Sequence, residues 1–197
     1  AGHTLYVNGT KMVLHQIPSG IFHQDKINII GNGVVLDPVT LKRECESVAK
    51  MGVEVKKNLF ISERTNIIIP SHRALDKASE LAKGESKIGS TLKGIGPAYM
   101  DKTGRNGLRV GDVISPSFKS IYNRVKEKHL HLLKIYDFEF SLDEIEKTWL
   151  ESIEFLKSLN LIDSEYYLNQ TLSKGKNILA EGAQGTMLDI DFGTYPF

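Results

Sequence analysis

The sequence has a single cysteine, almost no excess of charge and no long apolar run. One cysteine among 197 residues cannot form an internal disulfide framework, and it fits a reducing compartment. Lysine and arginine number 25 and aspartate and glutamate 24, so no overall field favours nucleic acid or an anionic membrane. No stretch approaches the roughly 20 apolar residues that span a bilayer, and we find no signal peptide. We therefore expect a cytoplasmic protein without nucleic-acid or membrane partners.

Histidine spacing typical of a metal site is lacking as well. Of the six histidines, His129 and His131 lie two apart on a predicted helix, so they face different sides and cannot bind one ion together. His3 differs from the others because Gly2 and Thr4 flank it, which leaves room for a ligand. A histidine near a chain end is also commonly just exposed to solvent, so both interpretations stay open on chemistry and spacing alone.

What the sequence does contain is an alternation of short apolar segments and amphipathic ones. With 197 residues, 41% of them apolar, the chain can bury one core, and we expect a single domain. The Asn8-Gly9 pair predicts a two-residue turn in a β-hairpin. Short strands are predicted within residues 27–38 and 59–70, and from Asn177 to Ala180. Strands that alternate with helices predict an α/β fold.

Capping residues predict where the first helix begins and ends. Asp37 followed by Pro38 is typical of a helix start, and Gly52 is a suitable end. Cys45 lies on the apolar face of this helix. We interpret it as a core residue rather than a nucleophile, because no neighbouring feature would activate its thiol.

Further helices follow from apolar spacing. One is predicted from about Ser71 to Lys83, and another begins near Phe118. Ser141 and Glu144 match a capping box at the start of the next helix, and a shorter helix is expected near residues 164–174.

Residues 88–112 form an unusual stretch with six of the chain's 17 glycines. We expect neither helix nor strand there, and little contribution to the core. Glycine-rich backbone with basic side chains suits a phosphate, because backbone N–H groups and guanidinium groups both satisfy its oxygens. A solvated surface loop has the same composition, so both readings stay open. The basic residues in or next to the stretch are Lys87, Lys93, Lys102, Arg105 and Arg109.

A second glycine-containing loop follows the predicted strand that ends at Ala180. In open α/β sheets, ligands bind at loops that leave the carboxyl ends of strands. Gly182 and Gly185 would let a ligand approach the backbone, and Gln184 offers an amide donor and acceptor. A tight turn with a capping glutamine explains the same residues equally well.

Taken together, five segments resemble the adenylosuccinate synthetase family, in its order and at its spacing. The resemblance implies an α/β fold like that of the P-loop nucleotide hydrolases, with a mostly parallel central sheet and flanking helices. It also implies one partial domain, 1–197, with a helical subdomain at about 113–175. The segments are AGHTLYVNG, LHQIPSGI, IGNGVVLDP, KGIGPAYMDKTGRNGLRVGD and EGAQGTMLDIDFGTYPF.

The family is a homodimeric ligase that joins IMP to L-aspartate at the expense of GTP, with Mg²⁺. The resemblance implies that His3 is the general acid and that Arg105 reaches the IMP phosphate of the neighbouring subunit. The Gly2 carbonyl would bind Mg²⁺. The implied IMP-binding residues are Ala1, Gly2, His3, Thr91, Arg105 and Gln184, and the implied GTP-binding residues are Gly2, His3 and Thr4.

Two positions depart from the family pattern. Ser90-Thr91 stands where a Thr-Thr pair is common, and Asn106 stands where a second arginine is common. The family's GDEGKGK loop, with the proton-abstracting aspartate, is expected before Ala1, and the guanine-binding and aspartate-binding loops beyond Phe197. We therefore expect a piece of a longer enzyme that is inactive alone. The alternative is a free-standing nucleotide-binding or dimerisation module.

Overall fold

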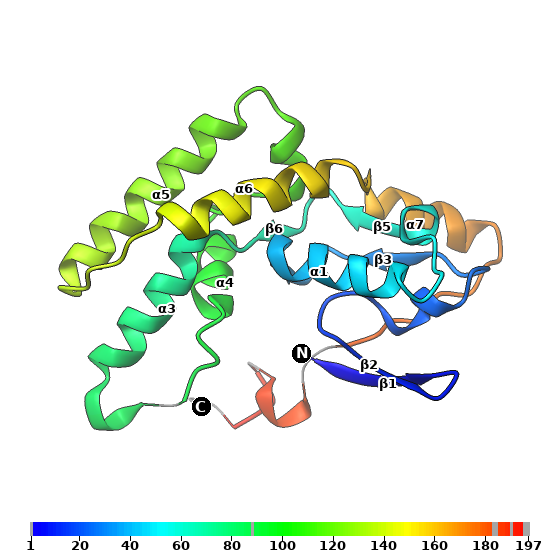
Figure 1. The fold of residues 1–197 in the computed structure, drawn as a ribbon, viewed down its shortest axis with the longest axis horizontal. Helices are drawn as coiled ribbons and strands as arrows, with labels where there is room; N and C mark the ends of the chain where they lie inside the picture. Colours follow the sequence, from blue (N-terminus) through cyan, green and yellow to red (C-terminus); the bar gives the residue numbers. More distant parts are fainter. Residues whose placement is uncertain (1, 88, 183–184, 190, 195–197) are drawn as a thin grey trace.

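The computed structural model describes residues 2–87, 89–182, 185–189 and 191–194. Short strands alternate with helices along the chain (Figure 1). The α-helices are α1 (Pro38–Ala49), α2 (Val55–Asn58), α3 (Pro70–Ala82), α4 (Ile95–Thr103), α5 (Phe118–Ile135), α6 (Asp143–Lys157) and α7 (Ser164–Ser173). Short 3-10 turns lie at Ser19–Phe22, Gly84–Ser86, Val110–Ile114 and Thr186–Leu188.

The chain begins with an antiparallel hairpin of β1 (His3–Val7) and β2 (Thr10–Leu14). Asn8 and Gly9 have φ angles of 49° and 80°, the left-handed pair that a two-residue hairpin turn requires. The predicted hairpin is therefore confirmed.

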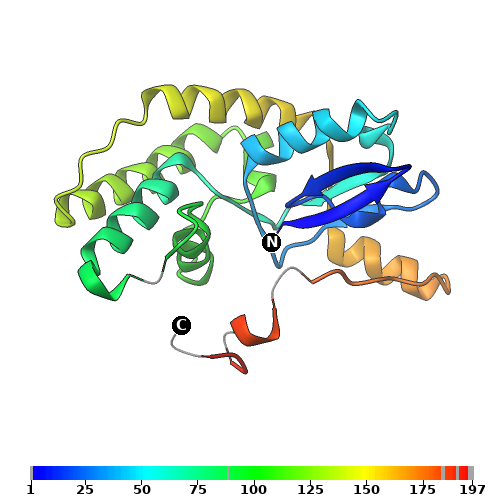
Figure 2. The same ribbon diagram turned by 60° about the horizontal axis from the view of Figure 1, so that its bottom comes forward.

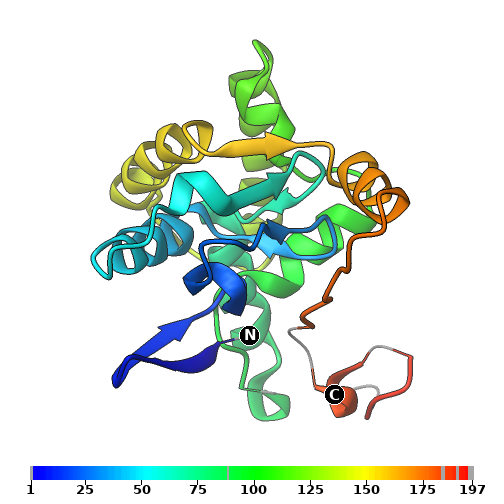
Figure 3. The same ribbon diagram turned by 90° about the vertical axis from the view of Figure 1, so that its right-hand side faces the viewer.

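The remaining strands pair in parallel, and the predicted α/β class is confirmed. A three-stranded sheet has the order β3-β5-β7, formed by Asn28–Ile30, Leu59–Ser62 and Asn160–Ile162. β4 (Val35–Leu36) pairs with β6 (Asn66–Ile67). Figure 3 shows α1 and α6 on one side of the three-stranded sheet and α7 on the other.

The predicted strand from Asn177 to Ala180 is wrong. These residues have no strand pairing among the described parts of the chain, and Leu179 is 94% exposed. An apolar segment becomes a strand only where a neighbouring strand satisfies its backbone groups. The edge strand β7, which the sequence analysis missed, has that neighbour in β5.

Helix starts were predicted with mixed success. Asp37 caps α1 by accepting the Val39 N–H at 3.1 Å, as expected. The capping box at Ser141 is wrong, because α6 begins one residue later than such a box requires. The Ser141 hydroxyl donates to the Asp143 carboxylate at 3.4 Å instead of accepting a backbone N–H of the first helical turn.

The main hydrophobic core of the described residues lies between the sheets and the helices. Trp149 of α6 is buried there, and its indole N–H donates to the Ile68 carbonyl at 2.9 Å. Cys45 is only 3% exposed, and burial raises the pKa of its thiol to about 12, which confirms its interpretation as a core residue. Other fully buried side chains are Leu14, Ile17, Ile21, Leu36, Leu41, Leu59, Ile61, Ile67, Ile69, Leu108 and Ile153.

The expectation that residues 88–112 contain no regular structure is wrong. They include all of α4, whose Ala98 is buried. Residues 108–111 then run beside residues 63–67, where Ile67 donates to the Leu108 carbonyl and Val110 donates to the Thr65 carbonyl, each at 2.8 Å. The glycines of this stretch allow its backbone to pack closely against neighbouring segments. A high glycine content therefore does not predict that the stretch is exposed to solvent.

Candidate active site

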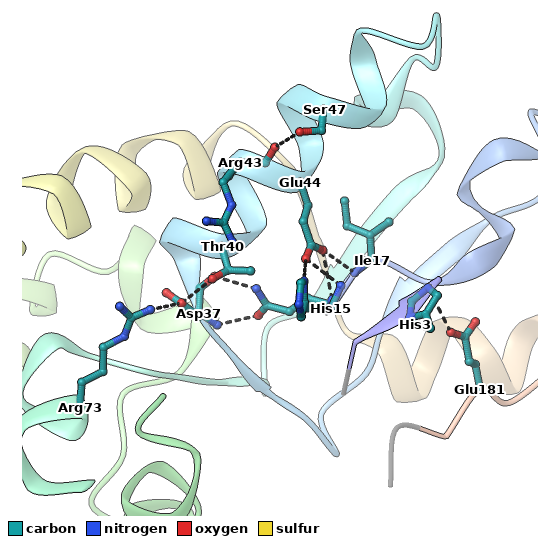
Figure 4. Close-up of polar contacts among 11 residues, drawn as sticks. His3, His15, Ile17, Asp37, Thr40, Arg43, Glu44, Ser47, Arg73 and Glu181 are labelled. Carbon is teal, nitrogen blue, oxygen red and sulfur yellow. Dashed lines mark hydrogen bonds and ion pairs between the residues drawn. The ribbon is translucent and has the colours of Figure 1, made fainter. Parts of the chain in front are cut away.

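His3 lies at the open end of the hairpin, at the start of β1 (Figure 4). Its side chain is 27% exposed, and its Nε2 atom is buried without a hydrogen-bond partner among the described residues. Glu181 Oε1 lies 3.7 Å from this nitrogen. The arrangement leaves one imidazole nitrogen in a sheltered position, next to a carboxylate and without a hydrogen bond among the described residues.

The Glu181 carboxylate also connects two distant segments. Ser19 donates to it through its backbone N–H at 2.9 Å and its hydroxyl at 3.1 Å. Figure 2 shows the chain after α7 returning toward the start of the hairpin. Glu181 could not be identified as a site residue from the sequence, because its signal, a carboxylate beside a histidine, exists only after folding.

Gly2 lies against the ring of His15. A Cβ atom at Gly2 would stand 3.0 Å from His15 Cδ2, so a larger residue there would have to displace the His15 ring. Glu44 fixes this ring by contacting His15 Nδ1 at 2.9 Å, and it also accepts the N–H groups of His15, Gln16 and Ile17 (Figure 4). His15 and Glu44 were not identified as site residues from the sequence.

The start of α1 is tied to the same region. Gln16 exchanges two hydrogen bonds with the Asp37 backbone, at 2.6 and 2.9 Å. The Asp37 carboxylate also accepts from Arg73 of α3 at 2.5 Å and from Thr40 at 2.7 Å (Figure 4). These contacts join the exit of β2 to α1 and α3.

Thr91 and Arg105 lie on either side of α4 in the chain. Both are exposed. α4 has nine residues, which corresponds to about 14 Å at 1.5 Å per residue. Arg105 follows the helix with a φ of 58°, in the left-handed region where glycine is usual after a helix end.

A buried cluster fixes α4 to its neighbours. His72 of α3 and His129 of α5 contact Asp101 Oδ2 of α4 at 3.1 and 2.8 Å, and Lys128 contacts Oδ1. Burial alone would raise the pKa of Asp101, but hydrogen bonds from His129, His72 and Lys128 hold it well below its usual range. An ionised carboxylate only accepts, so both histidine Nε2 atoms donate to it.

Among the described residues, His72, Asp101 and His129 lie close enough together to be considered as metal ligands. Their hydrogen bonds, however, do not fit a metal ion. The Ile69 N–H donates to His72 Nδ1 at 3.0 Å, so the ring proton must reside on Nε2. A metal at Nε2 would have to displace that proton. The cluster is therefore a packing element that fixes the helix between Thr91 and Arg105.

The other predicted site residues are placed as follows. Thr4 is exposed on β1, and Gly2 is exposed just before it. Ala1 and Gln184 lie outside the described residues. The structure thus brings His3 and Gly2 together with Glu181 and His15.

The adenylosuccinate synthetase family model matches residues 1–197. The chain belongs to the adenylosuccinate synthetase family. Adenylosuccinate synthetase of Flavobacterium johnsoniae is 57% identical over 199 residues, covering 100% of this chain and 47% of the relative. That of Bacteroides fragilis is 55% identical over 197 residues, covering 100% of this chain and 46% of the relative.

A solved structure supports the same assignment. The fully ligated adenylosuccinate synthetase of Plasmodium falciparum has a TM-score of 0.86 and 35% identity, and the match covers 100% of this chain and 46% of that one. The chain therefore spans about half the length of the adenylosuccinate synthetases it matches, which are ligases of purine biosynthesis. No helix in the described part of the chain is both long and apolar enough to cross a membrane.

Proposed function

We propose that the full-length protein containing this chain is a cytoplasmic, homodimeric adenylosuccinate synthetase. It joins IMP and L-aspartate to adenylosuccinate through 6-phosphoryl-IMP and uses GTP as the phosphoryl donor. The observation that carries the proposal is the sheltered Nε2 of His3 beside Glu181, in a chain that matches the family along its whole length. Residues 1–197 would form one part of the enzyme's domain, with the segment at about 113–175 as a helical subdomain.

His3 is proposed as the general acid. While an aspartate outside this chain removes the N1 proton of IMP, the γ-phosphoryl group of GTP moves to O6, and His3 stabilises the charge that develops on that oxygen. The amino group of the substrate L-aspartate then displaces phosphate at C6. A side chain that acts on charge developing in the transition state contributes to kcat more than to ground-state binding.

The IMP phosphate is assigned to Thr91 of one subunit and Arg105 of the partner subunit. Both side chains are exposed, so each is accessible to a phosphate. A guanidinium presents two N–H donors in one plane to two phosphate oxygens. Ala1, Gly2, His3 and Gln184 complete the proposed IMP contacts.

GTP is assigned to Gly2, His3 and Thr4, together with Mg²⁺ at the Gly2 carbonyl. Magnesium prefers oxygen ligands and is commonly bound through few protein groups and several phosphate oxygens. A backbone carbonyl of an exposed residue fits that pattern, whereas the nitrogen-containing cluster at Asp101 does not. Mg²⁺ would neutralise charge on the phosphates, and Gly2 would set where it sits.

The test uses the full-length enzyme with IMP, GTP and aspartate. His3→Asn should lower kcat by about 10²- to 10⁴-fold while changing the KM for IMP much less. An unchanged kcat with only a raised KM would show that His3 binds substrate without acting as an acid. The 197-residue chain alone should form no adenylosuccinate, and turnover by it would contradict the assignment of essential residues elsewhere. A non-catalytic nucleotide-binding or dimerisation module is the second candidate, and an inactive full-length protein would favour it.

A further inference from the structure

Two carboxylates of α3 contact the loop that carries Thr91. Asp76 and Glu80 lie four residues apart, so their side chains project from the same side of the helix. Both are buried, with 8% and 7% of their surface exposed. Residues 89–94 lie between α3 and α4, and their backbone runs along these two side chains.

Glu80 binds the beginning of the loop. Its Oε1 accepts the N–H of Gly89 at 2.7 Å and that of Ser90 at 3.4 Å. Its Oε2 accepts from Lys83 at 2.9 Å. The hydrogen bond from Lys83, followed by that from the Gly89 N–H, lowers the pKa of Glu80 to about 2, so the carboxylate is ionised near neutral pH.

Asp76 binds the middle and the end of the loop. Its Oδ1 accepts the Ser90 hydroxyl at 2.7 Å, and its Oδ2 accepts the Gly94 N–H at 2.8 Å. The Ser90 oxygen in turn accepts the N–H of Leu92 at 3.2 Å. Leu92 has a φ of 54°, a left-handed conformation uncommon for leucine, and the Ser90 contact helps to maintain it.

The end of the loop is pressed onto α3. A Cβ atom at Gly94 would stand 2.9 Å from the Arg73 nitrogen and the His72 carbonyl carbon, so only glycine fits. Thr91 and Lys93, by contrast, are exposed. The inner side of the loop faces the two carboxylates, and these two side chains lie on the outer side.

We propose that Asp76 and Glu80 are positioning residues that hold residues 89–94 so that Thr91 meets a phosphate monoester. The inference rests on the proposed function, which assigns Thr91 to the IMP phosphate. Carboxylates near an anion would repel it unless they were turned away from it. Here their four oxygens contact backbone N–H groups, Ser90 and Lys83, on the inner side. Neither carboxylate touches the anion.

The test compares kinetic constants of full-length variants. Asp76→Ala removes the contacts to Ser90 and Gly94 and should raise the KM for IMP about tenfold, the effect of losing roughly one charge-assisted hydrogen bond. The kcat and the KM values for GTP and aspartate should change less than about twofold. Ser90→Ala should raise the same KM, and Ser90→Thr, which keeps the hydroxyl, should not. Glu151→Ala, which removes an exposed carboxylate from α6, is the matched control.

A double-variant cycle tests whether the contacts act together. Asp76→Ala combined with Ser90→Ala should raise the KM for IMP little more than either change alone, because both remove the same link. If the increases in the KM for IMP of the two single variants multiply in the double variant, the proposed link between Asp76 and Ser90 is wrong. A fall in kcat with an unchanged KM for IMP would show a merely structural role and would also overturn the proposal. If Asp76→Ala does not fold, Ser90→Ala against Ser90→Thr decides alone.

Failure of the inference can be told from failure of the proposed function. In an active enzyme, a raised KM for IMP in Thr91→Ala with unchanged values in Asp76→Ala and Ser90→Ala would overturn the inference alone. If the full-length protein is inactive, the proposed function fails, and calorimetric titration with inorganic phosphate replaces the kinetics. Weaker phosphate binding by Asp76→Ala than by wild type then supports the positioning role. Equal binding, or none by wild type, overturns it.

Discussion

Glu181 Oε1 lies 3.7 Å from Nε2 of His3, although the two residues come from opposite ends of the described chain. The carboxylate is held in place by Ser19, whose N–H and hydroxyl donate to it. The surroundings of His3 therefore depend on a segment that is distant in the sequence.

We predict that Glu181→Ala lowers kcat of the full-length enzyme about threefold, because a contact between two partly exposed ionisable groups at 3.7 Å is worth roughly 0.2–1 kcal/mol. Glu181→Gln should be less damaging, since it keeps an acceptor for Ser19. Steady-state kinetics of both variants provides the measurement. In a His3→Asn background, Glu181→Ala should have little further effect, and an equal loss of kcat there would show that Glu181 acts independently of His3.

Arg105 should show opposite effects on stability and binding. Its left-handed backbone is unfavourable for a side chain with a Cβ, so Arg105→Gly should raise the free energy of unfolding of this chain by about 1 kcal/mol. Urea unfolding would measure the gain, and Arg105→Ala, which keeps the strain, should show none. In the full-length enzyme both changes should lower the affinity for IMP by about tenfold to a hundredfold, which is the effect of losing one charge-assisted hydrogen bond. Stabilisation by alanine would refute the strain argument.

Complementation tests whether Arg105 serves the neighbouring subunit. Arg105→Leu and His3→Asn homodimers should each be nearly inactive, whereas a mixed dimer has one site with both wild-type residues. Activity should partly return after subunit exchange, assayed as adenylosuccinate formation. No recovery in verified mixed dimers would mean that Arg105 acts within its own subunit or binds no phosphate.

Stability should fall on mild acidification because of His72. Burial lowers its pKa from an ordinary value of 6.5, so below about pH 6.5 the unfolded chain takes up this proton before the folded chain does. The contribution of His72 is complete above that pH and is lost as the pH falls. His72→Gln should lower the free energy of unfolding at pH 7 and flatten its decline between about pH 6.5 and 5. His131→Gln, at an exposed position on α5, should leave the pH dependence of the free energy of unfolding unchanged. If His72→Gln does not flatten this dependence either, a group other than His72 causes the loss of stability.

Local chemistry made part of this fold predictable. The Asn8-Gly9 turn and the Asp37 cap depend on neighbours within three residues, so the printed sequence contains the whole cause. The three residues of β7 have no distinctive pattern, and their place depends on β5. Likewise, α4 has only two buried residues, Ala98 and Asp101, so its periodicity is weak and partners on α3 and α5 fix it.

The candidate site divides in the same way. Family resemblance identified His3, Thr91 and Arg105, since each lies within a recognisable segment. The residues that set their geometry could not be identified because their contacts are long-range. Glu44 accepts from His15 across 29 positions, and Asp101 contacts His129 across 28. In the sequence alone, such carboxylates cannot be distinguished from ordinary surface residues. Only the fold shows which N–H groups donate hydrogen bonds to them.

The pairing of β5 with β7 has a consequence for how the molecule folds. Ser62, the last residue of β5, accepts a hydrogen bond at 2.8 Å from Ser164, which lies just after β7 and 102 positions further along the chain. Closing a loop of that size costs about 1 kcal/mol more than closing one of some 30 residues, such as that between β3 and β5. The β3–β5 pair can therefore form early, whereas β7 joins only after the intervening helices have collapsed. Amide protons of β7 should accordingly be the least protected of the three strands in hydrogen exchange.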